Sequence, residues 1–417
     1  MSQRFETPIR TGTALQAGLL LLVASIPFEY PERTIPLEIP TLTGAVFLLV
    51  TLFYPSRCYG RIPGPALGFA VYLAASLFTI MLGSGEHTSE AVSEFIVVLQ
   101  GVLVFLAAAN VMRDVSVARR ALMTLAAACS LRAALPFLGL GRTTDAVWTG
   151  GERVSALGQN ANSAAMIMAA GLVALIGLVF LIRHRTTFSL VLGGLLSALL
   201  ALAILETGSR GGLLALLGGV LVFALAANSW QQRVRNGTIA LLAISLLTAA
   251  ALSRPVMKNR LVDTATTGNL AGREQLYPAL WSMFLEKPLL GWGPVANGYE
   301  LAARVGERDR ASRAAHNVVL ELITAGGLLT ALPFIVGVWL SVQRAWRARA
   351  GEHGVLPLAL FSSVFLSNMS GDWGASKLLW LVLAYCLASG QWRATARCPA
   401  PVRSRRWVMT SLSGVRN

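Results

Sequence analysis

Long runs of apolar residues, each about as long as a bilayer is thick, recur along almost the whole chain. A membrane-spanning helix needs about 20 mostly apolar residues, because each residue advances it by about 1.5 Å across a hydrocarbon layer roughly 30 Å thick. Only 13% of the residues are charged, which is too few to cover such runs in water. We therefore expect an all-α, polytopic membrane protein. About twelve runs are candidates for such spans, although several are short, and they lie at 11–27, 37–54, 64–83, 91–112, 116–139, 160–182, 187–205, 210–227, 237–252, 316–340, 354–371 and 375–390.

The order of these runs divides the chain into four parts. Residues 1–252 hold the first nine expected spans and residues 316–390 hold the last three. Between them, residues 253–315 form one long, less apolar loop, and residues 391–417 form a basic tail. We expect the long loop to fold into amphipathic helices of its own.

One part of the long loop, GREQLYPALWSMFLEKPLLGWGP, has a clear helical pattern. Apolar residues recur at helical spacing along one side, and polar residues lie opposite them. This predicts a helix that starts near Pro278 and lies along the membrane surface. Its apolar side comprises Leu276, Leu280, Trp281, Phe284 and Leu285, and its polar side comprises Arg273, Glu274, Ser282 and Glu286.

The positions of lysine and arginine orient the chain in the membrane. If the N-terminus is cytosolic, the cytosolic segments hold 20 of these residues and the short outer loops hold 5. Positive charge accumulates on the cytosolic side, so we expect both termini there and the long loop outside. The net charge of +15 then comes from arginines in the loops. Such a charge suits contact with anionic lipid or phosphate and does not indicate binding to nucleic acid. The four cysteines have no metal-ligand spacing and indicate no disulfide framework.

Several arginines oppose this charge rule because they fall on the expected outer side. A guanidinium presents a rigid fork of donors that matches phosphate and pyrophosphate. If the folded chain brings these arginines together, they would form an anion-binding site. Each arginine alone is equally explained as a solvated residue at the membrane surface. Glu206 precedes one of them and is either a base or the partner of an arginine. The arginines are Arg142 and Arg153 in a polar loop, Arg210 in ETGSRGG, and Arg273 and Arg313 in the long loop.

One of only four histidines, His316, stands at the start of the expected helix 316–340. In a continuous helix Gly327 would lie on the same face, because eleven residues make about three turns. Imidazole titrates near neutral pH, so His316 is a candidate acceptor for a hydroxyl proton. The alternative is a polar residue that serves only the start of the helix.

Four segments together resemble a known family. His316 and Asn317, followed by Gly327 and Thr330, are similar to the histidine motif of bacterial O-antigen ligases. RVSALGQNANSAA resembles the arginine–asparagine motif of the wider ligase and polymerase superfamily, except that Ala161 stands where proline is frequent. ETGSRGG resembles its central arginine motif, and GREQLYPALW with GWGP resembles a segment of its large periplasmic loop.

The resemblance implies a membrane glycosyltransferase fold of the C type. It implies transfer of a polysaccharide from an undecaprenyl-pyrophosphate carrier to the lipid A–core oligosaccharide, at the periplasmic face of the Gram-negative inner membrane. It also implies that the enzyme works without a metal, a nucleotide sugar or another cofactor, and that its partners are these two lipids and the membrane lipids, not nucleic acid. On this basis the catalytic residues are His316, which would handle the acceptor hydroxyl, and Arg210 and Arg273, which would stabilise the pyrophosphate leaving group. The substrate-binding residues would be Arg142, Arg153, Asn160, Asn162, Glu206, Asn317 and Arg313.

Three other functions fit part of the sequence. An O-antigen polymerase would use the same donor, but the histidine motif favours a ligase. A transporter of lipid-linked saccharides would place ionisable residues near the middle of the membrane, where only Arg132, Glu94 and Glu321 are candidates. A metal-dependent glycosyltransferase would use paired carboxylates on an outer loop, and FEYPERTIPLEIP offers Glu29, Glu32 and Glu38.

Overall fold

A computed structural model describes residues 12–29, 38–83, 85–146, 151–181, 186–227, 229–306, 312–371 and 376–396. Glu32, residues 307–311 and the tail beyond residue 396 lie outside these ranges. The described chain is almost entirely helical. Its elements are α1 (Thr13–Ser25), η1 (Ile26–Phe28), α2 (Ile39–Leu52), α3 (Pro55–Cys58), α4 (Gly64–Gly83), η2 (Gly85–His87), α5 (Thr88–Val111), α6 (Val115–Phe137), β1 (Arg142–Ala146), β2 (Glu152–Ala156), α7 (Ala161–Ile176), η3 (Gly177–Leu181), α8 (Thr187–Glu206), α9 (Arg210–Leu225), α10 (Trp230–Ser253), α11 (Pro255–Thr267), α12 (Arg273–Glu286), α13 (Ala296–Val305), α14 (Val318–Ala325), α15 (Gly327–Arg347), α16 (Leu356–Asn368) and α17 (Lys377–Ala396).

Long apolar helices dominate the described part of the chain. Six of them are long and apolar enough to cross a membrane, namely α4, α5 with η2, α7 with most of η3, α8, α10 and α15, and four shorter apolar helices accompany them. This confirms a helical, multi-pass membrane protein. The number of spans and the side of the membrane on which each loop lies stay predictions.

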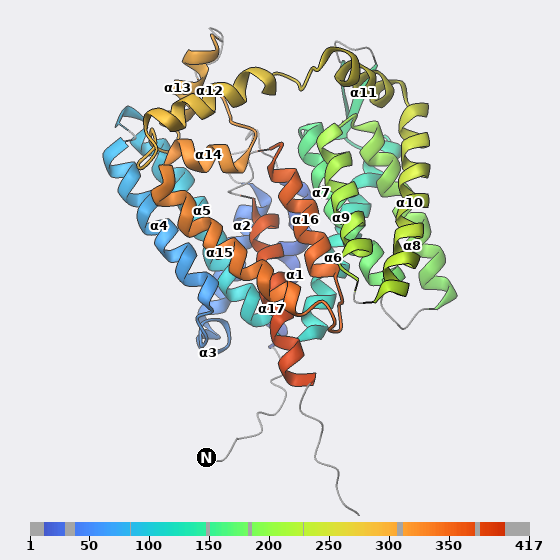
Figure 1. The fold of residues 1–417 in the computed structure, drawn as a ribbon. Helices are drawn as coiled ribbons and strands as arrows, with labels where there is room; N and C mark the ends of the chain where they lie inside the picture. The colour runs from blue at the N-terminus through green and yellow to red at the C-terminus, as the bar shows by residue number, and fades with distance from the viewer. Residues whose placement is uncertain are drawn as a thin grey trace, which may run out of the picture.

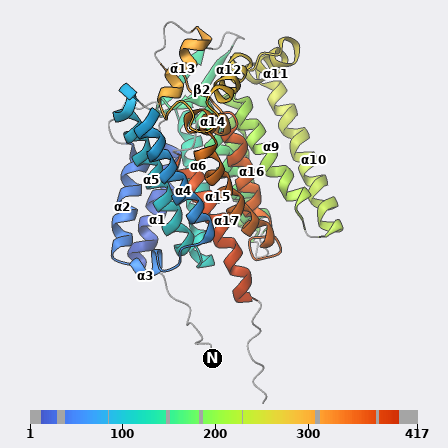
Figure 2. The same cartoon turned by 60° about the vertical axis from the view of Figure 1, so that its left-hand side comes forward.

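The long helices run side by side, and several shorter elements gather at one end of the bundle (Figure 1). This end, which carries β1, β2 and α11–α14, is called the loop end below. The same grouping is visible after rotation, with α3 at the opposite end (Figure 2). Residues far apart in the sequence therefore meet at the loop end, which sets the position of the candidate site.

The centre of the bundle is α7, which contacts α6, α8, α9 and α16. Small residues allow these helices to approach closely, as is typical of helix contacts in membranes. A Cβ on Gly212 of α9 would lie 2.4 Å from the Cβ of Ala165 in α7. The largest fully buried side chain, Trp380 of α17, likewise fills the space beside Gly101 of α5. This packing fixes the start of α9 against α7.

The structure corrects the expectation that residues 316–340 form one helix. The chain breaks at Gly326, so α14 and α15 are separate and His316 shares no helix face with Gly327. Residues 288–293 provide the missing hydrogen bonds at the break: Leu328 N donates to Pro288 O (2.8 Å), Leu329 N to Leu289 O (3.2 Å), Trp292 N to Thr324 O (2.8 Å) and Gly293 N to Ala325 O (2.8 Å). The periodicity of the sequence could not reveal this break, because its cause is a distant segment.

One smaller expectation was also wrong. The amphipathic helix α12 begins at Arg273 and contains Pro278, instead of starting there. Its early start is capped by Glu274, whose carboxylate accepts hydrogen bonds from the backbone N–H groups of Leu270 (3.1 Å) and Gly272 (3.2 Å). The polar loop after α6 holds a two-stranded antiparallel sheet, β1–β2, in which Asp145 pairs with Arg153. The fold is therefore helical with one short hairpin.

Candidate functional site

The first arginine of the site, Arg153, projects from β2 toward the start of α9. Its Nε donates to the carbonyl of Thr207 (2.7 Å) and its Nη2 donates to Oδ1 of Asn162 (2.6 Å). Asn160 caps the N-terminus of α7, where its Oδ1 accepts from the backbone N–H of Asn162 (2.9 Å). Asn160 thus caps α7, and Asn162 holds Arg153 of the hairpin in place.

The second arginine, Arg210, is the first residue of α9. Ser209 caps this helix by accepting from the backbone N–H of Gly212 (3.2 Å). The Nη1 of Arg210 donates to the carbonyl of Asn269 (2.8 Å) and to the hydroxyl of Thr264, so the guanidinium lies under α11 and the turn that follows it. The position predicted from ETGSRGG therefore faces the long loop.

The third arginine, Arg273, ties α12 to the end of α16. Its Nη2 donates to the carbonyl of Ser370 (2.7 Å). One turn further along α12, the hydroxyl of Tyr277 contacts the carbonyls of Met369 (3.2 Å) and His316 (3.4 Å). The carbonyls just beyond the end of α16 are thus bound by α12. His316 and Arg273 are joined to the same short segment after α16.

Sequence reasoning missed the fourth arginine, Arg260 of α11. A Cβ on Gly208 would lie 3.7 Å both from Cγ of Arg153 and from Cδ of Arg260, so these two side chains flank one glycine with φ +61°. The available signal was KNRLVDTATT, in which Arg260, Asp263 and Thr264 share one helical face. We call Arg153, Arg210, Arg260 and Arg273 the arginine quartet.

The arginine quartet concentrates positive charge in a partly buried place. Burial, followed by the neighbouring charges of Arg153, Arg210 and Arg273, lowers the pKa of Arg260 to about 10. Asp263 opposes this effect only in part. In addition, Nη1 of Arg260 and Nε of Arg273 are buried and have no hydrogen-bond partner among the described residues. Buried donors without partners and repulsion among like charges would both be relieved by a multivalent anion.

Arg313, Asn317 and His316 border the arginine quartet on the α14 side. The Nη2 of Arg313 lies 3.7 Å from the place of a Cβ on Gly272, next to Arg273. The side chain of Asn317 caps α14 by accepting from the backbone N–H groups of residues 319 (3.0 Å) and 320 (3.2 Å). His316 precedes this cap and has φ +52°, a conformation that is uncommon outside glycine and clusters at functional sites.

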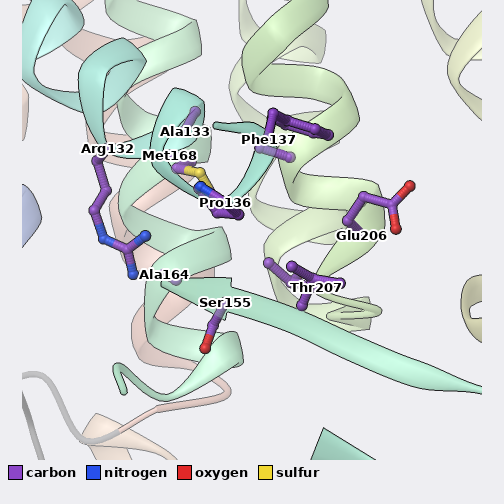
Figure 3. Close-up of a pocket in the computed structure, with 11 residues that line it drawn as sticks. Arg132, Ala133, Pro136, Phe137, Ser155, Ala164, Met168, Glu206 and Thr207 are labelled. Atoms are coloured by element: carbon purple, nitrogen blue, oxygen red, sulfur yellow. The ribbon is translucent and has the colours of Figure 1, made fainter. Parts of the chain in front are cut away.

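Two predicted binding residues are not brought to the arginine quartet. Arg142 is exposed, and the alternation of side chains along the hairpin directs it to the face opposite that of Arg153. Glu206 pairs with Arg254 (2.9 Å). It also lines a cavity of about 20 Å³, large enough for about one water molecule and too small for a sugar. Figure 3 shows the Glu206 carboxylate turned away from Arg132 on the far side of this cavity.

Of the carboxylates considered for a metal site, Glu29 is held at the start of α17. Burial raises the pKa of Glu29 to about 7, although the positive charge of Lys377 opposes this. Its carboxylate accepts a hydrogen bond from Ser376 (3.1 Å) at the start of α17. Among the described residues, no group of three His, Cys, Asp or Glu side chains is placed to hold a metal ion.

Part of the chain matches a known protein family. Residues 195–335 match the model of a family described as O-antigen ligase. The matched segment contains Arg210, Arg260, Arg273 and His316, and so most of the site just described. No curated protein gives a significant match to the chain.

Proposed function

We propose that this chain is an O-antigen ligase, and the match of residues 195–335 to a family model of that description supports the proposal. It would transfer O-antigen polysaccharide from undecaprenyl pyrophosphate to a sugar hydroxyl of the lipid A–core oligosaccharide. The reaction would take place at the periplasmic face of the Gram-negative inner membrane. The observation that carries this proposal is the arginine quartet beside His316, at the end of a bundle of apolar helices.

The arginine quartet suits the leaving group of this reaction. The bond between the anomeric carbon of the donor sugar and the pyrophosphate oxygen breaks, and the pyrophosphate carries away the electron pair. Fixed guanidiniums stabilise the charge that develops on this oxygen, since they are already oriented before the reaction. Arg210 and Arg273 are held by backbone carbonyls at 2.8 Å and 2.7 Å, so their charge is delivered at defined positions. They would supply the stabilisation that a metal ion gives in other transferases.

His316 is our candidate for the acceptor side. The acceptor hydroxyl oxygen forms the new bond to the anomeric carbon, and its proton must pass to a base. His316 is fixed by the Asn317 cap on one side and by Tyr277 at its carbonyl. It is joined through Tyr277 to the same short segment after α16 as Arg273. We propose that His316 accepts the proton of the acceptor hydroxyl. Arg313 and Asn317 are candidate contacts to the sugars.

The test is a reaction with purified protein, the carrier-linked donor and purified lipid A–core. We expect the donor polysaccharide to become attached to lipid A–core, and this transfer to persist in EDTA without added divalent ions. Extension of a carrier-linked chain in place of this product would identify a polymerase. Activity that is lost in EDTA and restored by magnesium or manganese would move the assignment to Glu29, Glu32 and Glu38.

A further inference from the structure

A second candidate binding site lies at the C-terminal end of α12, away from the arginine quartet. It is a groove of about 500 Å³ between the end of α4 and the segment that follows α12. A volume of this size is in the range of ligand-binding sites. Its lining consists of Thr79, Leu82, Gly83, Lys287, Pro288, Leu289, Leu290, Gly291 and Trp292.

The apolar lining indicates an occupant that arrives from the bilayer. Leu82 and Leu289 line the groove, and these residues are 61% and 67% exposed. The groove continues the exposed apolar face of α4, which is one of the six long apolar helices and on which Met81 is also exposed. A hydrocarbon chain can therefore pass from the lipid phase into the groove without crossing water.

The rim of the groove carries a cation suited to a phosphate. Lys287 places its ammonium 3.7 Å from the centre of the Trp292 ring. The nearby arginine, Arg304, is engaged with acids: it donates to both carboxylate oxygens of Glu286 (2.6 Å each) and to Glu300 (2.7 Å). Lys287, which lines the groove, is thus the cation placed to meet an anionic headgroup.

The distance to His316 decides which lipid fits. Residues 324 and 325 at the end of α14 bond to the segment that forms the groove, and His316 precedes the start of α14. Eight residues of helix separate them by about 12 Å. The donor cannot use this groove for its headgroup, because its pyrophosphate is bonded directly to the reacting carbon. The acceptor fits, because an oligosaccharide separates its lipid from the reacting hydroxyl.

We propose that the groove binds the acceptor lipid, with an acyl chain along Leu82 and Leu289 and a lipid phosphate on Lys287. This rests on the proposed function. The donor pyrophosphate then occupies the arginine quartet at the start of α12, and the acceptor lipid occupies the groove at its end. The two saccharides meet at His316, between these places.

The test measures binding of purified lipid A–core to donor-free protein, and then the KM of each substrate. We expect Lys287→Glu and Leu289→Trp each to weaken lipid A–core binding and raise its KM by about tenfold, while the donor KM stays unchanged. Lys287→Gln is the milder variant if charge reversal impairs folding. The matched controls are Leu195→Trp on α8, where the side chain is 65% exposed, and Arg235→Glu at the far end of α10. Both controls should behave like the wild type.

The outcomes separate this inference from the proposed reaction. Transfer with an unchanged acceptor KM in all groove variants would overturn the groove assignment and leave the ligase assignment standing. The wild-type protein could perform no transfer while the groove variants bind lipid A–core more weakly. That result would support the groove assignment and overturn the proposed reaction. If phosphatidylglycerol bound as tightly as lipid A–core and displaced it completely, the groove would bind an ordinary bilayer lipid. That result would overturn the assignment of the groove to the acceptor.

Discussion

At the residue scale, the roles proposed for His316 and Arg210 differ, and substitution should separate them. We expect His316→Ala to lower transfer by about 10²–10⁴-fold, the usual contribution of an acid–base residue, while donor binding is retained. Arg210→Ala should weaken donor binding itself, because it removes a cation from the pyrophosphate. Donor binding and transfer by the two purified variants are the measurements. Equal loss of donor affinity in both would assign His316 to the pyrophosphate site.

Arg260 offers a test that links stability to function. Its lowered pKa means that the folded protein disfavours the charged form. Arg260→Gln should therefore raise the free energy of unfolding by about 1 kcal/mol, after allowance for solvent screening, and at the same time weaken donor binding. Thermal unfolding with and without pyrophosphate measures both effects. Lys258→Gln, an exposed change on the same helix, is the control and should alter neither. A destabilised Arg260→Gln would show that the arginine serves packing instead.

The residue types at the site were predictable, but their partners were not. Arg153, Arg210, Arg273 and His316 stand out because charged residues are rare in such a chain. Arg260 does not stand out, because it lies in a polar helix where arginine is ordinary. The asparagines were expected to bind substrate, yet the side-chain oxygens of Asn160, Asn162 and Asn317 hold helix caps or an arginine. Those interactions depend on tertiary structure that periodicity does not encode.

At the scale of secondary-structure elements, the position of His316 depends on the break between α14 and α15. Gly327 has φ +62°, and a Cβ there would lie 2.3 Å from the carbonyl of Leu289. Gly327→Ala should therefore lower the free energy of unfolding by about 2 kcal/mol or more, from backbone strain and this contact. Thermal unfolding in detergent provides the measurement. Gly194→Ala in α8 should be neutral or stabilising, because an added Cβ there would meet no neighbouring group within 4 Å. Equal melting of the two variants would mean that the break tolerates a side chain.

The same break shows where element prediction from sequence ends. The apolar runs located the helices, because length and hydrophobicity are properties of each segment alone. The run 316–340 also met these criteria, but its two halves are divided by hydrogen bonds from residues 288–293. The hairpin was missed for a different reason. Its strands, RTTDA and ERVSA, are five residues each and carry little signal.

At the scale of the whole molecule, the loop end assembles its site from distant segments. The arginine quartet draws one residue each from β2, α9, α11 and α12, and the groove joins α4 to the segment after α12. The sequence predicted the class of protein, and its charge pattern put these loops on one side of the membrane, where they would form a site only if the fold gathers them. The groove itself was not predictable, because its walls are ordinary apolar residues that become a site only in the folded chain.

The arrangement works only if the loop end faces the periplasm. The asymmetry of 20 against 5 positive residues predicts this orientation. In a Cys398→Ser background, a cysteine at Ser282 should react in intact spheroplasts with an impermeant thiol reagent, and one at Glu352 should react only after the membrane is opened. Ser282 and Glu352 are both exposed, whereas the native Cys58, Cys129 and Cys386 are buried, so labelling reports the introduced cysteine. The helix α12 and the connection between α15 and α16 lie at opposite ends of the bundle (Figure 1). Labelling in the reverse order would place the arginine quartet and His316 in the cytosol, where a periplasmic ligase has no substrate.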